Sequence, residues 1–347
     1  MLNARDNVVT TKIKALFGKR LSLRDYETLL NKKHLSDIVL YLKSESYFKN
    51  CLIGINEKTI RRGQLENLIR NDLLHRLSTV LKYSLDVNDY SFKLVTLASE
   101  LDIIFDVVRS FYSGDRYSVI SSLPIMIESH LPFDLKKITA VDNMNSLCNE
   151  AKRSVYYKEL CKYRNVAIDE LNLTSFSHEL YNHYYEIVLA ELEKNFKSKK
   201  KEDLKSIFHI QMELHALSHL YRLKKYFKVS ANILKETINP TFHFLRKKDF
   251  TEIINRDNPE FVIEKLKESA YAHYFDFNSY KDDPIEVVID TILYNYNKSK
   301  IFFTSDKDIA LVVYNLLSKT EVQNIIDIIE GVRYGLSPDK IRKLLII

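Results

Sequence analysis

The chain contains 347 residues, of which 46% are hydrophobic and 28% charged, and its formal net charge is +6. These proportions exclude an intrinsically disordered chain and allow one large domain or two to three modules. The charge is mild and spread along the chain, whereas a nucleic-acid-binding protein usually carries a concentrated basic stripe. Only six Gly and six Pro occur, so the long runs of Leu, Ile, Lys, Glu and Tyr predict a protein that is almost entirely helical.

The first residues, MLNARDNVVTTKIK, lack the apolar core of a signal peptide. No run of about 18 uncharged apolar residues follows them, so no membrane-spanning helix is expected. The three cysteines, Cys51, Cys148 and Cys161, are odd in number and form no C-x-x-C motif. This usage predicts a reduced cytosolic protein with buried free thiols.

Two amphipathic helices are predicted at 59–84 and 177–196, because their apolar residues recur at helical spacing. A basic run follows the second, with lysines at Lys197, Lys199, Lys200 and Lys201. Blocks of like charge are usually solvated, so a helix end or linker is expected there, with a contact to an anion or lipid headgroup as the alternative.

One pattern of about 110 residues recurs along the chain. Strongly apolar helices are predicted to begin at Glu100, Glu213 and Glu321, at spacings of 113 and 108 residues. Arg109 and Arg222 occupy the same slot in the first two copies, and Glu replaces Arg in the third. Self-similarity at a fixed period indicates repeated structural units.

A second pattern has nearly the same period. The segments LKSESY, AKRSVY and LKESAY end at Tyr47, Tyr156 and Tyr271, at spacings of 109 and 115 residues. Each of the first two glutamates is followed by such a tyrosine, whereas Glu321 has none after it and Tyr47 has no such glutamate before it. We therefore predict that the C-terminal helices complete the N-terminal module. The predicted modules are 1–99, 100–212 and 213–347, arranged around a pseudo-threefold axis.

The end of the chain specifies one last short helix. Gly335 can adopt the left-handed conformation that closes a helix, Ser337 is a good N-cap, and Pro338 suits the first helical position. Ile341, Leu344 and Leu345 then share one stripe. This apolar face is expected to pack against another part of the protein.

No motif for catalysis or cofactor binding stands out. The chain has no P-loop, no G-x-G-x-x-G and no H-E-x-x-H. His215 and His219 share a helix face, but further zinc ligands at suitable spacing are missing. No local signature supports Cys161 as a nucleophile. We therefore expect no active site, no cofactor and no metal.

The charged residues of the first pattern are interpreted as contacts between modules or with a partner. Glu100 and Arg109 point to opposite sides of their helix, so they cannot pair, and Glu100 needs a partner from another segment. The residues proposed for such contacts are Glu100, Arg109, Glu213, Arg222, Glu321, Asn324 and Arg333.

Segments 321–345, 11–47 and 212–227 together resemble one protein family. The likeness is to the C subunit of prokaryotic V-type (A-type) ATPases, the homologue of the eukaryotic V-ATPase d subunit. Asp102 and Ile103 depart from the Asn-Ile that the family often has. The residues that carry the resemblance are Leu21, Asp25, Tyr26, Leu29, Leu30, Leu42, Tyr47, Glu321, Asn324, Ile325, Ile328, Gly335, Leu336, Pro338 and Ile341.

The resemblance implies an all-helical funnel of three similar modules. It implies a non-catalytic central-stalk subunit that couples a rotor shaft of subunits D and F to the membrane proteolipid ring, for proton or sodium transport. Such a subunit lies at the cytoplasmic face of the membrane and binds no nucleic acid. The alternatives are a helical-repeat scaffold for another protein, or a helical nucleic-acid-binding protein that uses Lys and Tyr.

Overall fold

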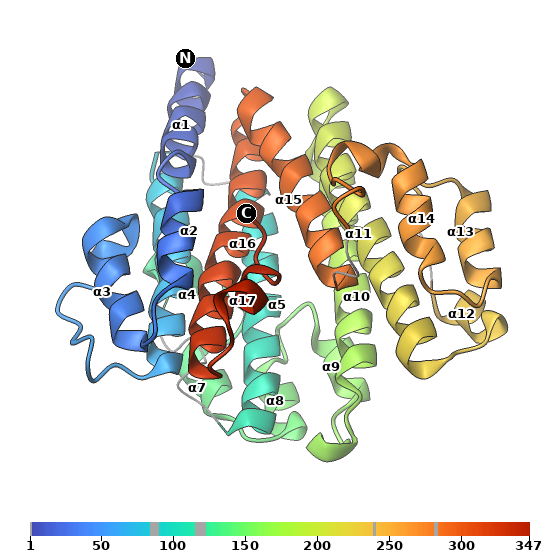
Figure 1. The fold of residues 1–347 in the computed structure, drawn as a ribbon, viewed down its shortest axis with the longest axis horizontal. Coiled ribbons are helices and arrows are strands. Elements are labelled where there is room, and N and C mark those ends of the chain that lie inside the picture. The colour runs from blue at the N-terminus through green and yellow to red at the C-terminus, as the bar shows by residue number, and fades with distance from the viewer. Residues whose placement is uncertain (1, 84–89, 115–122, 239–240, 281–283) are drawn as a thin grey trace.

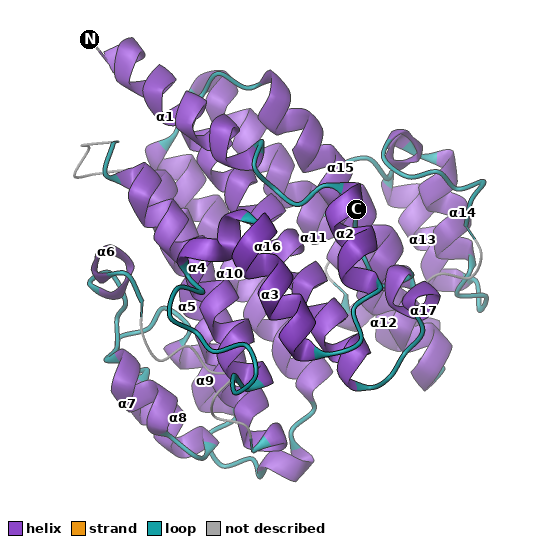
Figure 2. Ribbon diagram, turned by 60° about the vertical axis from the view of Figure 1, so that its left-hand side comes forward, coloured by secondary structure: helices purple, strands orange, loops and turns teal. Residues whose placement is uncertain are grey.

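The structure is a computed structural model that describes residues 2–83, 90–114, 123–238, 241–280 and 284–347. Within these ranges the regular secondary structure is helical, and no strand occurs (Figure 2). The prediction of an all-α protein is therefore confirmed. The modules 1–99, 100–212 and 213–347 and their pseudo-threefold axis stay a prediction.

The N-terminal half begins with three helices of moderate length, continues with two long ones and ends in short ones. Their bounds are α1 (Leu2–Phe17), α2 (Leu23–Leu30), α3 (Leu35–Glu45), η1 (Tyr47–Asn50), α4 (Arg62–Leu81), α5 (Tyr90–Ser113), α6 (Ile125–Glu128), α7 (Leu135–Ala140), α8 (Met144–Glu150), α9 (Tyr157–Lys162) and η3 (Ile168–Glu170).

The C-terminal half contains the other long helices. Their bounds and those of the short helices between them are α10 (Leu173–Asn195), α11 (Ser198–Phe227), α12 (Ala231–Thr237), α13 (Lys247–Asn255), α14 (Phe261–Glu268), η4 (Ala270–His273), α15 (Ile285–Phe303), α16 (Lys307–Arg333) and α17 (Pro338–Arg342).

Helix α16 lies at the centre of the fold and packs against α1, α4, α5 and α15 (Figure 1). Asp306 caps its N-terminus, because its carboxylate accepts hydrogen bonds from the backbone N–H groups of Asp308 and Ile309. Its apolar residues are buried on several faces, as expected of a helix surrounded by others. Through its contacts with α1, α2 and α3, this last long helix is joined to the first helices of the chain.

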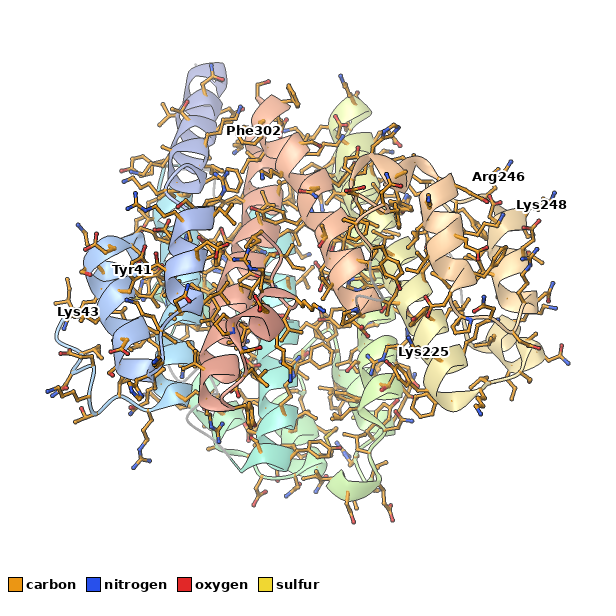
Figure 3. The ribbon with its side chains drawn as sticks, in the orientation of Figure 1. Tyr41, Lys43, Lys225, Arg246, Lys248 and Phe302 are labelled. Atoms are coloured by element: carbon orange, nitrogen blue, oxygen red, sulfur yellow. The ribbon has the colours of Figure 1, made fainter. Side chains whose placement is uncertain are left out.

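The short helices lie outside the long ones. Figure 3 places Tyr41 and Lys43 of α3 on one flank and Arg246 and Lys248 at α13 on the opposite flank. The long helices α5, α10, α11, α15 and α16 run between these flanks (Figure 1).

The corner after α16 forms as predicted. Gly335 has a φ of 65°, its N–H donates to Val332, and the N–H of Leu336 donates to the carbonyl of Gly331. These two bonds form a Schellman motif. Ser337 then precedes Pro338 at the start of α17. The predicted stripe is partly wrong: Ile341 and Leu345 are buried, but Leu344 follows the end of α17 and is 39% exposed.

The predicted helix starts at Glu100, Glu213 and Glu321 are wrong. The three residues lie well inside α5, α11 and α16, because the residues before each continue the apolar helical period without Gly or Pro. Residues 100 and 213, at which the second and third modules are predicted to start, therefore fall inside the continuous helices α5 and α11.

The expectations for the basic run and the thiols are partly met. The basic run lies at the start of α11, but its lysines are not all solvated: Lys200 pairs with Asp306 at 3.0 Å and Lys201 with Glu193 at 2.9 Å. The three thiols are free, but Cys148 alone is fully buried.

Candidate functional site: the cavity between the long helices

The two sequence patterns meet at buried carboxylates. Glu321 on α16 accepts a hydrogen bond from the backbone N–H of Leu21 at 2.7 Å and another from the hydroxyl of Tyr47. Both donors belong to the N-terminal segment, about 300 and 274 positions away. The contact therefore links the C-terminal helix directly to the N-terminal helices.

Glu213 makes the corresponding contact on α11. Its carboxylate accepts from the backbone N–H groups of His243 and Phe244, at 2.8 and 3.0 Å, and from the hydroxyl of Tyr271. A single buried carboxylate thus satisfies several donors of a loop, which is the usual condition for burying a charge-bearing group.

Glu100 on α5 makes a variant of this contact. It accepts a hydrogen bond from the hydroxyl of Ser154 at 2.5 Å, whereas the Tyr156 hydroxyl donates to the carbonyl of Leu97 at 3.1 Å. Burial raises the pKa of Glu100 to about 7, and hydrogen bonds from Ser154 and the Val155 backbone offset part of this effect.

The other two glutamates respond to burial in the same direction. Burial raises the pKa of Glu213 and of Glu321, while the hydrogen bonds from Tyr271 and Tyr47 oppose the rise. The three side chains hold segments together inside the protein. We therefore interpret them as structural contacts.

Asn324, one turn beyond Glu321, holds the end of the chain. Its amide donates to the carbonyl of Ile346 at 2.6 Å and accepts from the N–H of Ile346 at 2.9 Å. The same amide donates to the hydroxyl of Tyr26 at 3.3 Å. The backbone N–H and carbonyl of Ile346 therefore both have a hydrogen-bond partner, which fixes the C-terminal residues against α16.

The three arginines lie nearer the surface and in weaker contacts. Arg109 pairs with Asp106 at 3.0 Å, as expected from its position opposite Glu100. Arg222 lies 3.6 Å from Glu286, and Arg333 lies 3.9 Å from Glu330. Asp106 is buried, but the other two pairs are exposed or partly exposed, and such pairs contribute roughly 0–1 kcal/mol each to stability.

A cavity of about 630 Å³ lies among α5, α10, α11, α15 and α16. A second cavity of about 430 Å³ adjoins it and shares part of its wall, including Tyr181, His215 and Asp290. Asn324 lines the larger cavity, and Arg109 and Arg222 line the smaller one. Asn324 therefore lies at one cavity and the two arginines at its neighbour, whereas Glu100, Glu213, Glu321 and Arg333 are not part of these two walls.

Acidic side chains line the larger cavity on α15 and α16. Glu286 and Asp290 stand one turn apart on α15, and Asp327 faces them from α16. Asp290 is exposed to the solvent of the cavity, but the nearby walls desolvate it in part, and together with the charges of Glu286 and Asp327 they raise its pKa to about 7. Asp102 on α5 is paired with Lys319 at 2.5 Å.

Two buried amides also line the larger cavity. Gln211 on α11 is 7% exposed and Asn297 on α15 is 4% exposed. The Nε2 of Gln211 and the Oδ1 of Asn297 have no hydrogen-bond partner among the described residues. Buried polar atoms are normally satisfied, so these two indicate a site that a ligand or water completes.

The histidines of the two walls are neutral at physiological pH. Burial lowers the pKa of His215 and of His219 to about 4, and His219 stacks on His178 at a ring distance of 4.3 Å. Within the described part of the chain, no three His, Cys, Asp or Glu side chains are placed to bind one metal ion. The walls of the two cavities are therefore partly polar, and the wall of the larger cavity carries acidic side chains.

Sequence reasoning missed the acidic wall. The signal that could have found it is the polar stripe of Glu286, Asp290 and Asn297, spaced by four and seven residues on a helix that has a separate apolar face. A stripe of this kind at helical spacing indicates a second polar face on a buried helix.

A protein-family model matches nearly the whole chain. The model of a family described as ATP synthase (C/AC39) subunit matches residues 9–344. No curated protein gives a significant match to the chain. Among the helices described here, none has both the length and the apolar character needed to cross a bilayer.

Proposed function

The chain belongs to the ATP synthase (C/AC39) subunit family, and from this membership we propose that it is a non-catalytic central-stalk subunit of a rotary V/A-type ATPase. It couples a rotor shaft formed by subunits D and F to the proteolipid ring of the membrane sector. It thereby takes part in proton or sodium transport. It lies at the cytoplasmic face of the membrane, where the ring holds it.

The observation that carries this proposal is the family match, which spans residues 9–344. The central cavity supports the proposal, because about 630 Å³ walled by five long helices can receive the end of another protein. The buried glutamates support it as well. They tie helices together, and a coupling subunit must resist deformation if it is to transmit torque.

The docked C-terminus favours this function over an open scaffold. An open helical solenoid needs a terminal repeat with a polar outer face. Here α1 packs against α16, and Asn324 holds the apolar residue Ile346. The two ends of the chain therefore share one core.

Ion uptake by membrane vesicles tests the proposal. Vesicles from cells that lack the chain are expected to lose ATP-driven ion uptake, and the added purified protein is expected to restore it. A tagged chain is expected to co-purify with subunits D and F and the proteolipid. The isolated protein is expected not to hydrolyse ATP. Uptake that is unchanged without the chain would contradict the proposal, as would hydrolysis by the pure protein.

A further inference from the structure

We infer that the central cavity binds a basic side chain, an Arg or Lys, at the tip of a helical partner protein, and that Asp290 and Asp327 are the groups that bind it. The inference rests on the proposed function, which makes the D–F shaft the partner that enters the cavity. It adds the chemistry of the contact and the residues of this chain that make it.

The balance of charge in the cavity favours a cation. Three carboxylates line it from α15 and α16, namely Glu286, Asp290 and Asp327. Lys319 also lines it, but this lysine is paired with Asp102 at 2.5 Å. Arg222, in the wall of the adjoining cavity, lies 3.6 Å from Glu286 and offsets only that carboxylate. Asp290 and Asp327 are left without a cationic partner among the described residues.

The hydrogen-bonding state of the wall favours a ligand with many donors. Asn297, seven residues beyond the solvent-exposed Asp290 on α15, has a buried Oδ1 without a partner among the described residues. Asp327 accepts from the amide of Gln323 at 2.8 Å. A guanidinium carries five N–H donors and an ammonium carries three, so either can satisfy several of these acceptors at once.

The size of the cavity favours a side chain that arrives on a protein. The larger cavity alone measures about 630 Å³, which is far more than a single ion occupies. The apolar residues Leu344 and Ile346 near the C-terminus also line it. A wall that combines apolar and acidic side chains suits the end of a helix that buries its own apolar residues and presents a charged tip.

Proton release accompanies this binding. Because Asp290 has a pKa of about 7 in the free protein, it is partly protonated near neutral pH. A cation beside it favours the ionised form, so docking expels the proton and affinity rises between pH 6 and pH 8. The charged and titratable groups that line the two cavities with Asp290 are Glu286 on its own helix, Asp327 and Lys319 on α16, Asp102 and Arg109 on α5, His215, His219 and Arg222 on α11, and His178, Tyr181 and Tyr185 on α10.

Calorimetric titration of the full-length protein with purified D–F complex tests the inference at pH 6 and pH 8. Asp290→Asn and Asp327→Asn are each expected to weaken binding by about tenfold or more, because a charge contact that the complex buries is lost. Asp290→Asn should also abolish the pH dependence, and Asp290→Glu should restore part of it. Glu264→Gln, at an exposed glutamate of α14, is the matched control and should bind like the wild type.

The possible failures are distinguishable. If D–F binds the wild type but both asparagine variants, folded by circular dichroism, bind equally well, the inference is wrong and the proposed function stands. A pH dependence that survives in Asp290→Asn also overturns the inference. If D–F does not bind the wild type at all, the proposed function fails and the inference fails with it.

Discussion

The hydroxyl of Tyr47 donates a hydrogen bond to the carboxylate of Glu321, which lies 274 positions further along the chain. The backbone N–H of Leu21 donates to the same carboxylate at 2.7 Å. One side chain of the last long helix therefore satisfies two groups of the N-terminal helices. The stability of the beginning of the chain thus depends on its end.

Removing the Tyr47 hydroxyl should destabilise the protein. Tyr47→Phe leaves the buried carboxylate of Glu321 with one donor fewer, and the free energy of unfolding should fall by about 1–3 kcal/mol. Urea unfolding followed by helical circular dichroism measures the change. Tyr334→Phe, at an exposed tyrosine, is the control and should change the free energy by less than about 0.5 kcal/mol. Equal stability of Tyr47→Phe and the wild type would contradict the role given to this bond.

Removing residues 336–347 should destabilise the N-terminal helices as well as the C-terminus. The deletion takes away three buried side chains, Ile341, Leu345 and Ile346. Burial of each contributes roughly 1.5–3 kcal/mol, so the loss approaches the net stability of a typical domain, about 5–15 kcal/mol. Hydrogen exchange should show lost protection between residues 21 and 47.

The control for this truncation is removal of Ile347 alone, which is exposed and should have little effect. Fraying confined to the C-terminus would mean that the chain ends are energetically independent. In that case the prediction that the C-terminal helices complete the N-terminal module would be wrong.

Gly331→Ala should have opposite effects in two backgrounds. A Cβ at position 331 would lie 2.5 Å from Cγ1 of Ile341, so α17 cannot stay in place and the wild type should lose about 1–3 kcal/mol. In an Ile341→Ala background the obstructing atoms are absent. There the helix should gain about 0.5–1 kcal/mol, because Ala favours a helix interior over Gly. Thermal unfolding of the four variants gives the sign, and a loss in both backgrounds would contradict this account.

The contribution of Glu100 to the free energy of unfolding should fall as pH rises. Its pKa is about 7 in the folded protein and near 4.5 in an unfolded chain, so the folded state holds the proton more tightly. This stabilisation is complete below about pH 4.5 and is lost as pH rises through about 7, and it amounts to on the order of 3 kcal/mol. Glu100→Gln should therefore be more stable relative to the wild type at pH 8 than at pH 5, by urea unfolding at both values. Glu264→Gln should show no such difference, and a flat difference for Glu100→Gln would refute the assignment.

The sequence predicted the contacts that follow from local periodicity. The repeated glutamates and tyrosines indicated that separate segments correspond, and two of the pairs, Glu213 with Tyr271 and Glu321 with Tyr47, are hydrogen-bonded. The corner at Gly335 was also predictable, since its backbone requirement is met by one residue type. The predicted helix starts were wrong because apolar periodicity continues upstream of each glutamate.

The cavity could not be predicted in the same way. Its wall combines Asp102, Gln211 and Asp290 from three helices that are far apart in sequence, so it depends on how those helices pack. The high pKa of Asp290 has the same origin, because the walls that desolvate it come from several segments. A single sequence gives the periodicity of each helix but not the distances between helices.

The bond between Tyr47 and Glu321 also bears on how the protein is made. A ribosome adds roughly 5–20 residues per second, so residues 21–47 emerge on the order of 15–60 seconds before Glu321 does. During that interval the apolar surfaces of α1, α2 and α3 that α16 later covers stay open to other nascent chains. Production of this protein should therefore depend on chaperone supply, even though the finished fold is tightly closed.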